Sequence, residues 1–554
     1  MSFETMDVTR CPTRRGITND WYLIKSLYAI KPRFSVLFQM MFLLWTVAIV
    51  LAIILYCRQI YWRFSKYGVK HLPPVPLLGD MAPVIFRQEH FLQNMDRVYN
   101  SFRGERFVGY VEFVRPVLIV RDIELVKRIT VKDFEHFLDH AVVVDKSIDP
   151  YFGRNLFSLK GQEWKDMRST LSPAFTSSKI KLMVPFMEEA GDNMVRKLKN
   201  DIGAYIDVDF KNICTRYAND VIASCAFGLK VDSQSTDNEF YRMGKMASNL
   251  TNFVQAMKFF ACQSIPGVMK FFKVGIFSKV TEKFFRQIMT QTMKEREKNN
   301  IMRPDMIHLL MEAKKGNLKK EEDNAGTDAG FATASYTKND FPSAWTDDDL
   351  IAQTVIFFVA GFETVAQAMA FLVYELAVNP DAQEKLVQEI KDNDKKNGGK
   401  FDFKSIQEMT YLDMCVTELM RMWTPGVIID RICTKDCNLG RPNDSATQDY
   451  TIPLGAIHHD PQYFPDPDKF DPERFAPENR HKIIPFTYNP FGCGPRNCIA
   501  SRFALCEIKV LVYQLLQHME ISPCEKTVIP VQLDKAYITP VIIGGHWVRV
   551  QARE

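Results

Sequence analysis

The chain has 554 residues, of which 46% are hydrophobic and 25% charged, and its formal net charge is +4. This composition excludes a disordered chain and indicates a globular protein with a large core. No basic run is interleaved with aromatic residues, so we expect no nucleic-acid partner. The twelve cysteines and ten histidines show no zinc-type spacing. Because a chain of this length can build its core without disulfides, we expect most cysteines to be reduced.

Residues 35–57, SVLFQMMFLLWTVAIVLAIILYC, contain no charged side chain and are long enough to cross a bilayer as a helix. A cleaved signal peptide is the alternative, but its apolar region is shorter and ends in small residues. Here the stretch continues into an aromatic and basic border with Trp62 and Arg63, which is typical of a retained anchor. We therefore predict a transmembrane anchor at 35–57, preceded by an N-terminal extension at 1–34. Basic residues flank both ends, so charge counting does not decide the orientation.

A basic and proline-rich hinge is predicted at 58–80, because the prolines of HLPPVPLLG exclude a helix there. The remaining residues, 81–554, are mostly typical of amphipathic helices, with short β-like runs at 106–120 and 537–550. A polar stretch without periodicity, about 316–345, predicts a loop between two helices. The pattern predicts one large, mainly α domain with small sheets.

A long buried helix is predicted after Thr346, because a hydroxyl cap and three aspartates precede a long apolar run. Its middle carries AGFET, 360–364, which is unusual for a buried helix. Glycine costs about 1 kcal/mol against alanine, and Glu363 is expensive to bury without a partner. The motif alone is weak evidence of function. One turn earlier, Phe357 and Phe358 are candidates for the wall of an apolar pocket, although core packing would also explain each of them.

Glu418 and Arg421 are three residues apart and therefore lie on one face of a predicted helix. A solvated surface pair is the usual explanation of such spacing. The surrounding YLDMCVTELMRMW is apolar, however, so we expect an internal pair. Internal charges need further partners, and Arg474 in the downstream segment PERF is a candidate.

The segment FGCGPRNCIA, 491–500, places Cys498 in a loop shaped by glycine and proline, directly before an amphipathic helix. Gly492 and Gly494 let the backbone approach a flat ligand where side chains would clash. Arg496 adds a fixed positive charge beside the thiol, and the next helix aims free N–H groups at the sulfur. These features favour a thiolate, which is the form of cysteine that binds metal.

Together these motifs resemble those of the cytochrome P-450 monooxygenases, with the strongest likeness to insect microsomal members that act on hydrophobic foreign compounds. FGCGPRNCIA matches the family's F-x-x-G-x-R-x-C-x-G except at the last glycine, where this chain has Ala500. AGFET, ELMR and PERF match further motifs, and the resemblance runs from the proline hinge to the C-terminus. It implies the P-450 fold, a large helical domain with small β-sheets behind one N-terminal transmembrane helix.

The resemblance implies a haem (iron protoporphyrin IX) whose iron is bound by the Cys498 thiolate. In the family the long helix opens locally, so that Thr364, helped by Glu363, would relay protons to the iron-bound oxygen. The ELMR and PERF charges would hold the cysteine loop in place. Further cofactor contacts are expected from residues at matching positions, which are Trp164, Arg168, Arg431, Phe491 and Arg496.

The implied activity is the insertion of one oxygen atom from O2 into a hydrophobic small molecule. Electrons would come from NADPH through a flavoprotein reductase on the same membrane, with a microsomal b-type cytochrome as a further partner. The low disulfide content and the family both favour the endoplasmic reticulum membrane, with the catalytic domain facing the cytosol. A basic docking face for the reductase is expected from Lys165, Lys179, Lys181, Arg502 and Lys509, although a solvated charged face would explain them equally well.

Two departures from the family pattern concern the haem pocket, and two alternative functions also remain open. Ala500 adds a methyl group where the helix would pack against the porphyrin, which predicts slight crowding. The segment 449–461, DYTIPLGAIHHDP, is shorter than the family's connection and predicts a truncated or rebuilt strand beside the pocket. One alternative is a haem-thiolate isomerase or dehydratase, but such enzymes often lack the helix threonine, so Thr364 argues against it. The other is a haem- or ligand-binding protein without turnover.

Overall fold

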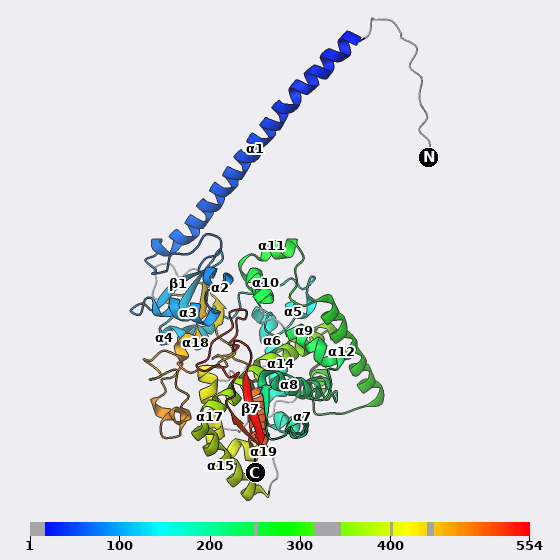
Figure 1. Cartoon of the computed structure of the whole chain (residues 1–554), viewed down its shortest axis with the longest axis vertical. Helices are drawn as coiled ribbons and strands as arrows, with labels where there is room; N and C mark the ends of the chain where they lie inside the picture. The colour runs from blue at the N-terminus through cyan, green and yellow to red at the C-terminus, as the bar shows by residue number, and fades with distance from the viewer. Residues whose placement is uncertain (1–16, 249–252, 315–344, 399–402, 440–447, 554) are drawn as a thin grey trace. The chain divides into compact units, whose positions relative to one another are not determined.

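The chain divides into two compact units, residues 1–63 and 64–554. The computed structural model describes residues 17–248, 253–314, 345–398, 403–439 and 448–553 (Figure 1). The start of the predicted N-terminal extension and nearly all of the predicted loop at 316–345 lie outside the described residues.

The first unit contains most of helix α1 (Ile17–Lys66). The most apolar 18-residue window of its stretch Phe38–Lys66 has a mean hydropathy of 2.6, and its apolar side chains are mostly exposed, as in a membrane anchor. The helix extends beyond the predicted span 35–57, because no glycine or proline follows before Gly68, whose φ is 67°. Residues 58–66 of the predicted hinge are therefore helical.

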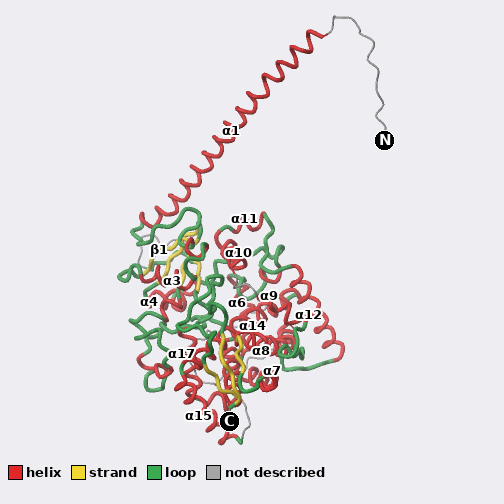
Figure 2. The backbone as a smooth tube through the Cα atoms, viewed as in Figure 1, coloured by secondary structure: helices red, strands yellow, loops and turns green. Residues whose placement is uncertain are grey.

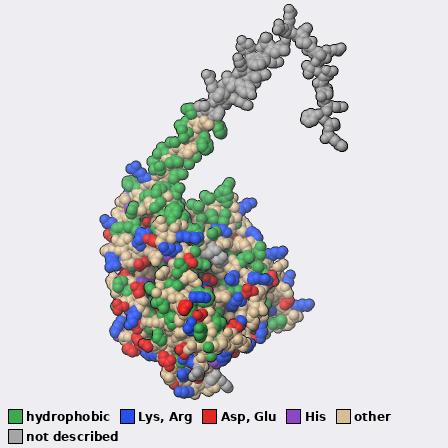
Figure 3. Space-filling model, viewed as in Figure 1, with side chains coloured by type: hydrophobic (Ala, Val, Ile, Leu, Met, Phe, Trp, Pro, Cys, Tyr) green, Lys and Arg blue, Asp and Glu red, His purple; other side chains and the backbone are tan. Residues whose placement is uncertain are grey.

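The second unit is mainly helical (Figure 2). Its α-helices are α2 (Ala82–Ile85), α3 (Phe91–Asn100), α4 (Ile123–Lys127), α5 (Pro150–Gly153), α6 (Gly161–Leu171), α7 (Ser177–Asp201), α8 (Phe210–Phe227), α9 (Glu239–Ser248), α10 (Phe253–Ser264), α11 (Pro266–Phe271), α12 (Lys279–Asn299), α13 (Met306–Lys314), α14 (Asp347–Val378), α15 (Pro380–Asn397), α16 (Phe403–Glu408), α17 (Thr410–Met422), α18 (Leu454–His458) and α19 (Ser501–His518). On the visible face of this unit, positively charged Lys and Arg side chains and negatively charged Asp and Glu side chains are interspersed (Figure 3).

Two small sheets accompany the helices. The first has the strand order β1 (Phe107–Glu112), β2 (Arg115–Val120), β5 (Asp449–Ile452) and β4 (Ile429–Ile432). In it, β2 and β5 run parallel and the other neighbours antiparallel. The second sheet is antiparallel, in the order β3 (Ile206–Asp209), β7 (Trp547–Ala552) and β6 (Met519–Ser522).

The two predicted β-like runs have different outcomes. The run at 106–120 is confirmed as the hairpin β1–β2. The run at 537–550 is wrong over most of its length, because the strand begins only at Trp547. Pro540 cannot donate a ladder hydrogen bond, and Gly544 and Gly545 turn the backbone with positive φ.

The short segment at 449–461 supplies an inner strand of the first sheet. Its strand β5 pairs with β2 on one side and with β4 on the other. Asp449 lies opposite Val117 of β2 and Ile432 of β4. Helix α18 begins directly after Pro453. The segment therefore keeps the sheet continuous with a strand of only four residues.

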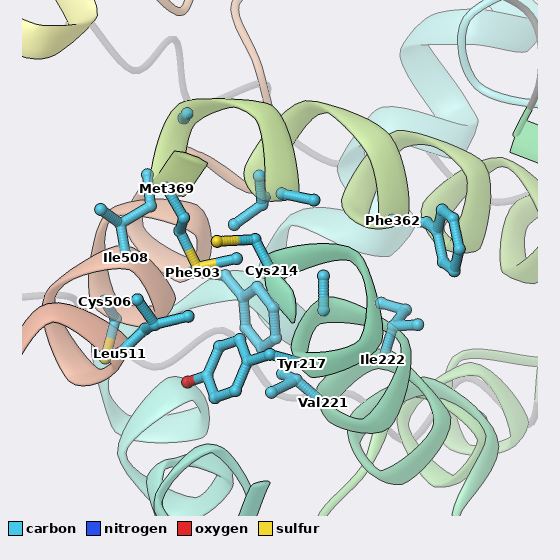
Figure 4. Close-up of a cluster of buried hydrophobic side chains, with 14 of the residues drawn as sticks. Cys214, Tyr217, Val221, Ile222, Phe362, Met369, Phe503, Cys506, Ile508 and Leu511 are labelled. Carbon is cyan, nitrogen blue, oxygen red and sulfur yellow. The ribbon is translucent and has the colours of Figure 1, made fainter. Parts of the chain in front are cut away.

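Helix α14 forms the centre of the core. Thr346 and Asp349 bond reciprocally at its start, which confirms the predicted cap. The helix is apolar enough to span a membrane, but 72% of its most apolar stretch is buried inside the unit, so it is a core helix. Figure 4 shows side chains of α8, α14 and α19 meeting there, including Tyr217, Val221, Ile222, Phe362, Met369, Ile508 and Leu511.

Candidate functional site

A cavity of about 460 Å³ lies between α14 and the loop that precedes α19. Its wall is mainly apolar and includes Phe175, Phe259 and Val365. The predicted site residues that line it are Thr364, Arg431, Phe491, Arg496 and Cys498. The fold therefore brings a hydroxyl, two guanidinium groups and a thiol to one apolar chamber.

The cysteine loop has the backbone shape that its glycines allow. Gly492 and Gly494 have φ of 74° and 73°, in the left-handed region. A Cβ on Gly494 would lie 1.8 Å from the carbonyl oxygen of Thr130, so a side chain does not fit there. The N–H of Cys498 donates to the carbonyl oxygen of Phe491 at 2.8 Å, which closes the loop.

The surroundings of Cys498 favour a thiolate only in part. Burial raises the pKa of the Cys498 thiol, while a hydrogen bond from the backbone of Ala500 and the charge of Arg168 act in the opposite direction. The net direction is upward, although the Cys498 residue is exposed at the cavity wall, so the thiolate stays a prediction. A metal ion at the sulfur would supply the missing stabilisation, because a coordinating thiol loses its proton.

Two buried arginines lie close together at the cavity wall. Arg431 donates from Nη1 to the carbonyl oxygen of Asp430 at 2.8 Å, and its buried Nε has no partner among the described residues. Burial and the positive charge of Arg431 lower the pKa of Arg496. Arg496 donates to three backbone carbonyl oxygens, those of Leu138 (2.7 Å), Phe157 (3.1 Å) and Leu159 (2.6 Å).

This pair of arginines fits a ligand that carries carboxylates. Haem, the expected cofactor, has two propionates. A carboxylate beside Arg431 would satisfy its free Nε and would relieve the repulsion between the two guanidinium groups. Cys498 on the same wall is a donor of the kind that binds haem iron. The residues present therefore fit this cofactor.

Trp164 and Arg168 of α6 are not among the residues that line the cavity. The Arg496 guanidinium lies 4.5 Å from the centre of the Trp164 ring, in a cation–π contact. Arg168 donates from its two terminal nitrogens to the O and Oδ1 atoms of Asn497, each at 2.8 Å. Helix α6 thus supports Arg496 and the residue before Cys498 from behind.

The AGFET motif presents small and polar groups to the cavity, which Ala360, Gly361 and Thr364 line. A Cβ on Gly361 would meet only the Ile222 side chain, at 3.2 Å. The helix is continuous through the motif, so the expected local opening is absent from the described structure. The Thr364 hydroxyl donates to the carbonyl oxygen of Ala360, which belongs to the preceding turn.

Glu363 lies outside the cavity wall and is paired with Lys211 of α8. The Nζ and Oε1 atoms are 2.8 Å apart, and both side chains are mostly buried. Among the described residues, no hydrogen bond joins Glu363 directly to Thr364. A link between them would need water.

The two phenylalanines before the motif have different roles. Phe357 lines the cavity and meets Phe175 edge-on, with ring centres 5.2 Å apart, so its predicted place in the wall is confirmed. The same prediction is wrong for Phe358, which is fully buried against Phe227 and Phe240. One residue along a helix rotates the side chain by about 100°, which turns Phe358 into the core.

The predicted internal triad is confirmed. Arg421 makes two hydrogen bonds to the Glu418 carboxylate, at 2.8 and 2.9 Å, and neither side chain is exposed. Arg474 approaches the same carboxylate at 3.3 Å.

His458, which sequence analysis did not single out, connects this triad to the cysteine loop. Its carbonyl oxygen accepts from Arg421 at 2.9 Å, and its Nε2 accepts from the N–H of Asn489 at 3.1 Å. Burial lowers the pKa of His458 to about 3, so the ring is neutral and can accept. Asn489 lies two residues before Phe491, where the cysteine loop begins, so the triad is linked to this loop through one histidine.

The cavity wall also contains two polar residues that were not predicted from the sequence, His140 and Gln263. His140 Nδ1 lies 2.8 Å from Asp430 Oδ1, beside Arg431. Neither residue belongs to a recognisable local motif, and only the fold brings them to the cavity.

One of the five basic residues suggested for the reductase docking face is not exposed. Lys509 is buried and donates to Asp413 at 2.7 Å, so its place on an exposed face is wrong. Lys165 is bonded to Glu135 at 2.7 Å, while Arg502 is exposed.

Comparisons with known proteins agree with this geometry. A model of the family described as cytochrome P450 matches residues 70–542. Cytochrome P450 9e2 of Blattella germanica is 41% identical over 538 residues, covering 92% of this chain and 98% of the relative. Probable cytochrome P450 9f2 of Drosophila melanogaster is 39% identical over 505 residues, covering 88% and 95%. Cytochrome P450 6k1 of Blattella germanica is 34% identical over 483 residues, covering 86% and 90%.

Proposed function

Because this chain belongs to the cytochrome P450 family of haem-thiolate monooxygenases, we propose that it inserts one oxygen atom from O2 into a hydrophobic small molecule. The observation that carries the proposal is the meeting of Cys498, Arg431, Arg496 and Thr364 on one largely apolar cavity. Apolar walls bind lipophilic molecules and keep water away from them. The substrate class proposed is that of lipophilic foreign compounds.

The residues proposed to hold the haem act from one side of the cavity. Cys498 would bind the iron, and Arg431 and Arg496 would hold the two propionates. Phe491 would lie against the flat ring, while Trp164 and Arg168 would position Arg496 and Asn497. When bound, haem supplies the oxidation chemistry, and a thiolate ligand favours O–O cleavage.

Thr364 is proposed to hold and move the proton needed at the reacting oxygen. Its hydroxyl is on the cavity wall and, among the residues that the structure describes, bonds only to the Ala360 carbonyl oxygen, from which it can turn away. Glu363 would relay protons to Thr364 through water, with Lys211 Nζ, 2.8 Å from Glu363 Oε1, holding the carboxylate in place. Both are proposed catalytic residues. The presence of Thr364 on the wall weighs against an isomerase or dehydratase.

The proposed electron source is NADPH, through a flavoprotein reductase in the same membrane, with a b-type cytochrome as a further partner. Helix α1 supports a membrane location, which we place in the endoplasmic reticulum. Residues 81–554 would form the catalytic domain on the cytosolic side.

The carbon monoxide difference spectrum of the dithionite-reduced protein in membranes tests the haem site. We expect a strongly red-shifted Soret band in the wild type and its loss in Cys498→Ser. The matched control is Cys493→Ser, since Cys493 is in the same loop but bonds to Thr130. An unshifted band in the wild type would contradict thiolate ligation.

Reconstitution with the reductase tests the reaction. A monooxygenase consumes NADPH and O2 as it forms a hydroxylated product. Rearrangement of a peroxide without NADPH would support the isomerase or dehydratase instead. A normal spectrum with no turnover of any kind would support a protein that only binds haem.

A further inference from the structure

One hydrogen-bonding side chain on the cavity wall has no part in the function proposed above. Thr364 is assigned to proton movement. Five other polar lining residues belong to the proposed haem side of the cavity, namely His140, Asp430, Arg431, Arg496 and Cys498. Among the lining residues that the structure describes, Gln263 at the end of α10 remains without a role.

Arg115 fixes the orientation of the Gln263 amide. Its Nη2 donates to Gln263 Oε1 at 3.0 Å. A guanidinium has donors and no acceptor, so the amide must turn its oxygen toward Arg115. Arg115 is in turn bonded to Glu112 at 3.0 Å and paired with Asp449 at 3.3 Å. These residues belong to β1, β2 and β5, so the amide is held by the sheet.

The Nε2 atom of Gln263 therefore faces away from Arg115. The residue is 9% exposed, and within the described part of the chain its Nε2 has no hydrogen-bond partner. Because Gln263 lines the cavity, this N–H is available to a ligand that can accept a hydrogen bond from it. The positive charge of Arg115 beside Oε1 also polarises the Gln263 amide, which makes Nε2 a better hydrogen-bond donor.

We propose that Gln263 is a specificity-determining residue that donates from Nε2 to a neutral oxygen of an otherwise lipophilic substrate. This proposal rests on the proposed monooxygenase function and names its substrate class: molecules with a ketone, ester or ether oxygen. A carboxylate is not favoured, because the positive charge of Arg115 is already matched by Glu112 and Asp449. A cationic substrate is not favoured either, because it would meet an N–H donor.

The test uses two ligands that differ by one carbonyl oxygen, n-hexylbenzene and hexanophenone. Their Kd values are measured by equilibrium dialysis for the wild type, Gln263→Leu and Gln263→Glu. Leucine removes both polar atoms. Glutamate keeps the shape and the acceptor for Arg115, yet its carboxylate has no N–H to donate. The matched control is Gln291→Leu, the same change at an exposed position of α12.

The ratio of the two Kd values within each variant cancels the difference in the ligands' own hydrophobicity. We expect the preference for the ketone to fall about three- to tenfold in both Gln263 variants and to stay unchanged in the control. A preference that is kept in either Gln263 variant would overturn the proposal. The wild-type carbon monoxide spectrum and the NADPH-driven oxidation of n-hexylbenzene test the underlying function separately, since neither depends on a carbonyl group.

Discussion

Of the two glycines in the cysteine loop, Gly494 leaves less room for a side chain. Its φ of 73° disfavours any side chain, and a Cβ would collide with the backbone oxygen of Thr130, which cannot swing aside. We expect Gly494→Ala to displace the loop and to abolish most haem incorporation, measured as the Soret absorbance per mole of purified protein.

Gly398→Ala is the matched control for this prediction. Its φ is 60°, but a Cβ there meets nothing within 4 Å, so it adds the backbone cost of about 1 kcal/mol without the collision. Equal haem contents in the two variants would contradict the steric argument.

At the same scale, the sequence predicted those site residues whose role depends on local spacing. Cys498, its glycines and Arg496 lie within ten positions, and their pattern determines the loop. The direction of the Cys498 pKa was not predictable, because it depends on which parts of the folded chain surround the thiol. His140 and Gln263 were not predictable for a related reason: they reach the cavity only through long-range packing.

At the scale of elements, the contact between α14 and the end of α17 contains a buried acid. Glu375 accepts from Trp423 Nε1 at 2.7 Å. Burial, reinforced by the nearby Glu418, raises the pKa of Glu375 to about 7, although the Trp423 hydrogen bond opposes this. The folded state therefore binds a proton between pH 4.5 and 7 that the unfolded state has released.

The free energy of unfolding must consequently fall as the pH rises through this window, by about 3 kcal/mol at most. We expect Glu375→Gln to remove this loss, because glutamine keeps an acceptor for Trp423 and carries no charge. The variant should unfold at a higher Tm than the wild type at pH 8 and at a similar Tm at pH 5. Glu384→Gln, at an exposed position on α15, is the control. The same Tm difference at both pH values would contradict the raised pKa.

The elements themselves were predictable wherever a cap, a breaker or a turn is encoded nearby. Thr346 and its aspartates mark the start of α14, and the hairpin β1–β2 follows from its β-branched residues. The strand expected at 537–550 forms only from Trp547 onward, because Pro540 and the two glycines outweigh the apolar pattern before it. Phe358 and Lys509 were misplaced because spacing alone does not say which face of a helix meets another helix.

For the whole molecule, the division near residue 63 predicts that the catalytic part folds without its anchor. A chain lacking residues 1–63 should keep the red-shifted carbon monoxide band while losing the α1 anchor. A second chain lacking 1–66 should be less stable, because it also loses Phe64, whose ring lies over Gly109 and is 2% exposed. The measurements are the spectrum and the Tm of both chains. Loss of the band in the longer chain would show that α1 is needed for folding.

The two long apolar helices have a consequence for biosynthesis. A ribosome delivering this chain to a membrane presents α1 first and, much later, α14, whose most apolar 18-residue window has a mean hydropathy of 1.8 and also suits insertion. Glu363, Glu375 and the aspartates that begin α14 each make entry into lipid costly, by about 2.5 to 3.5 kcal/mol for an acid at the centre of a span. The acids of α14 therefore disfavour its insertion into lipid and favour its packing against α8 and α19, which contact it in the folded unit.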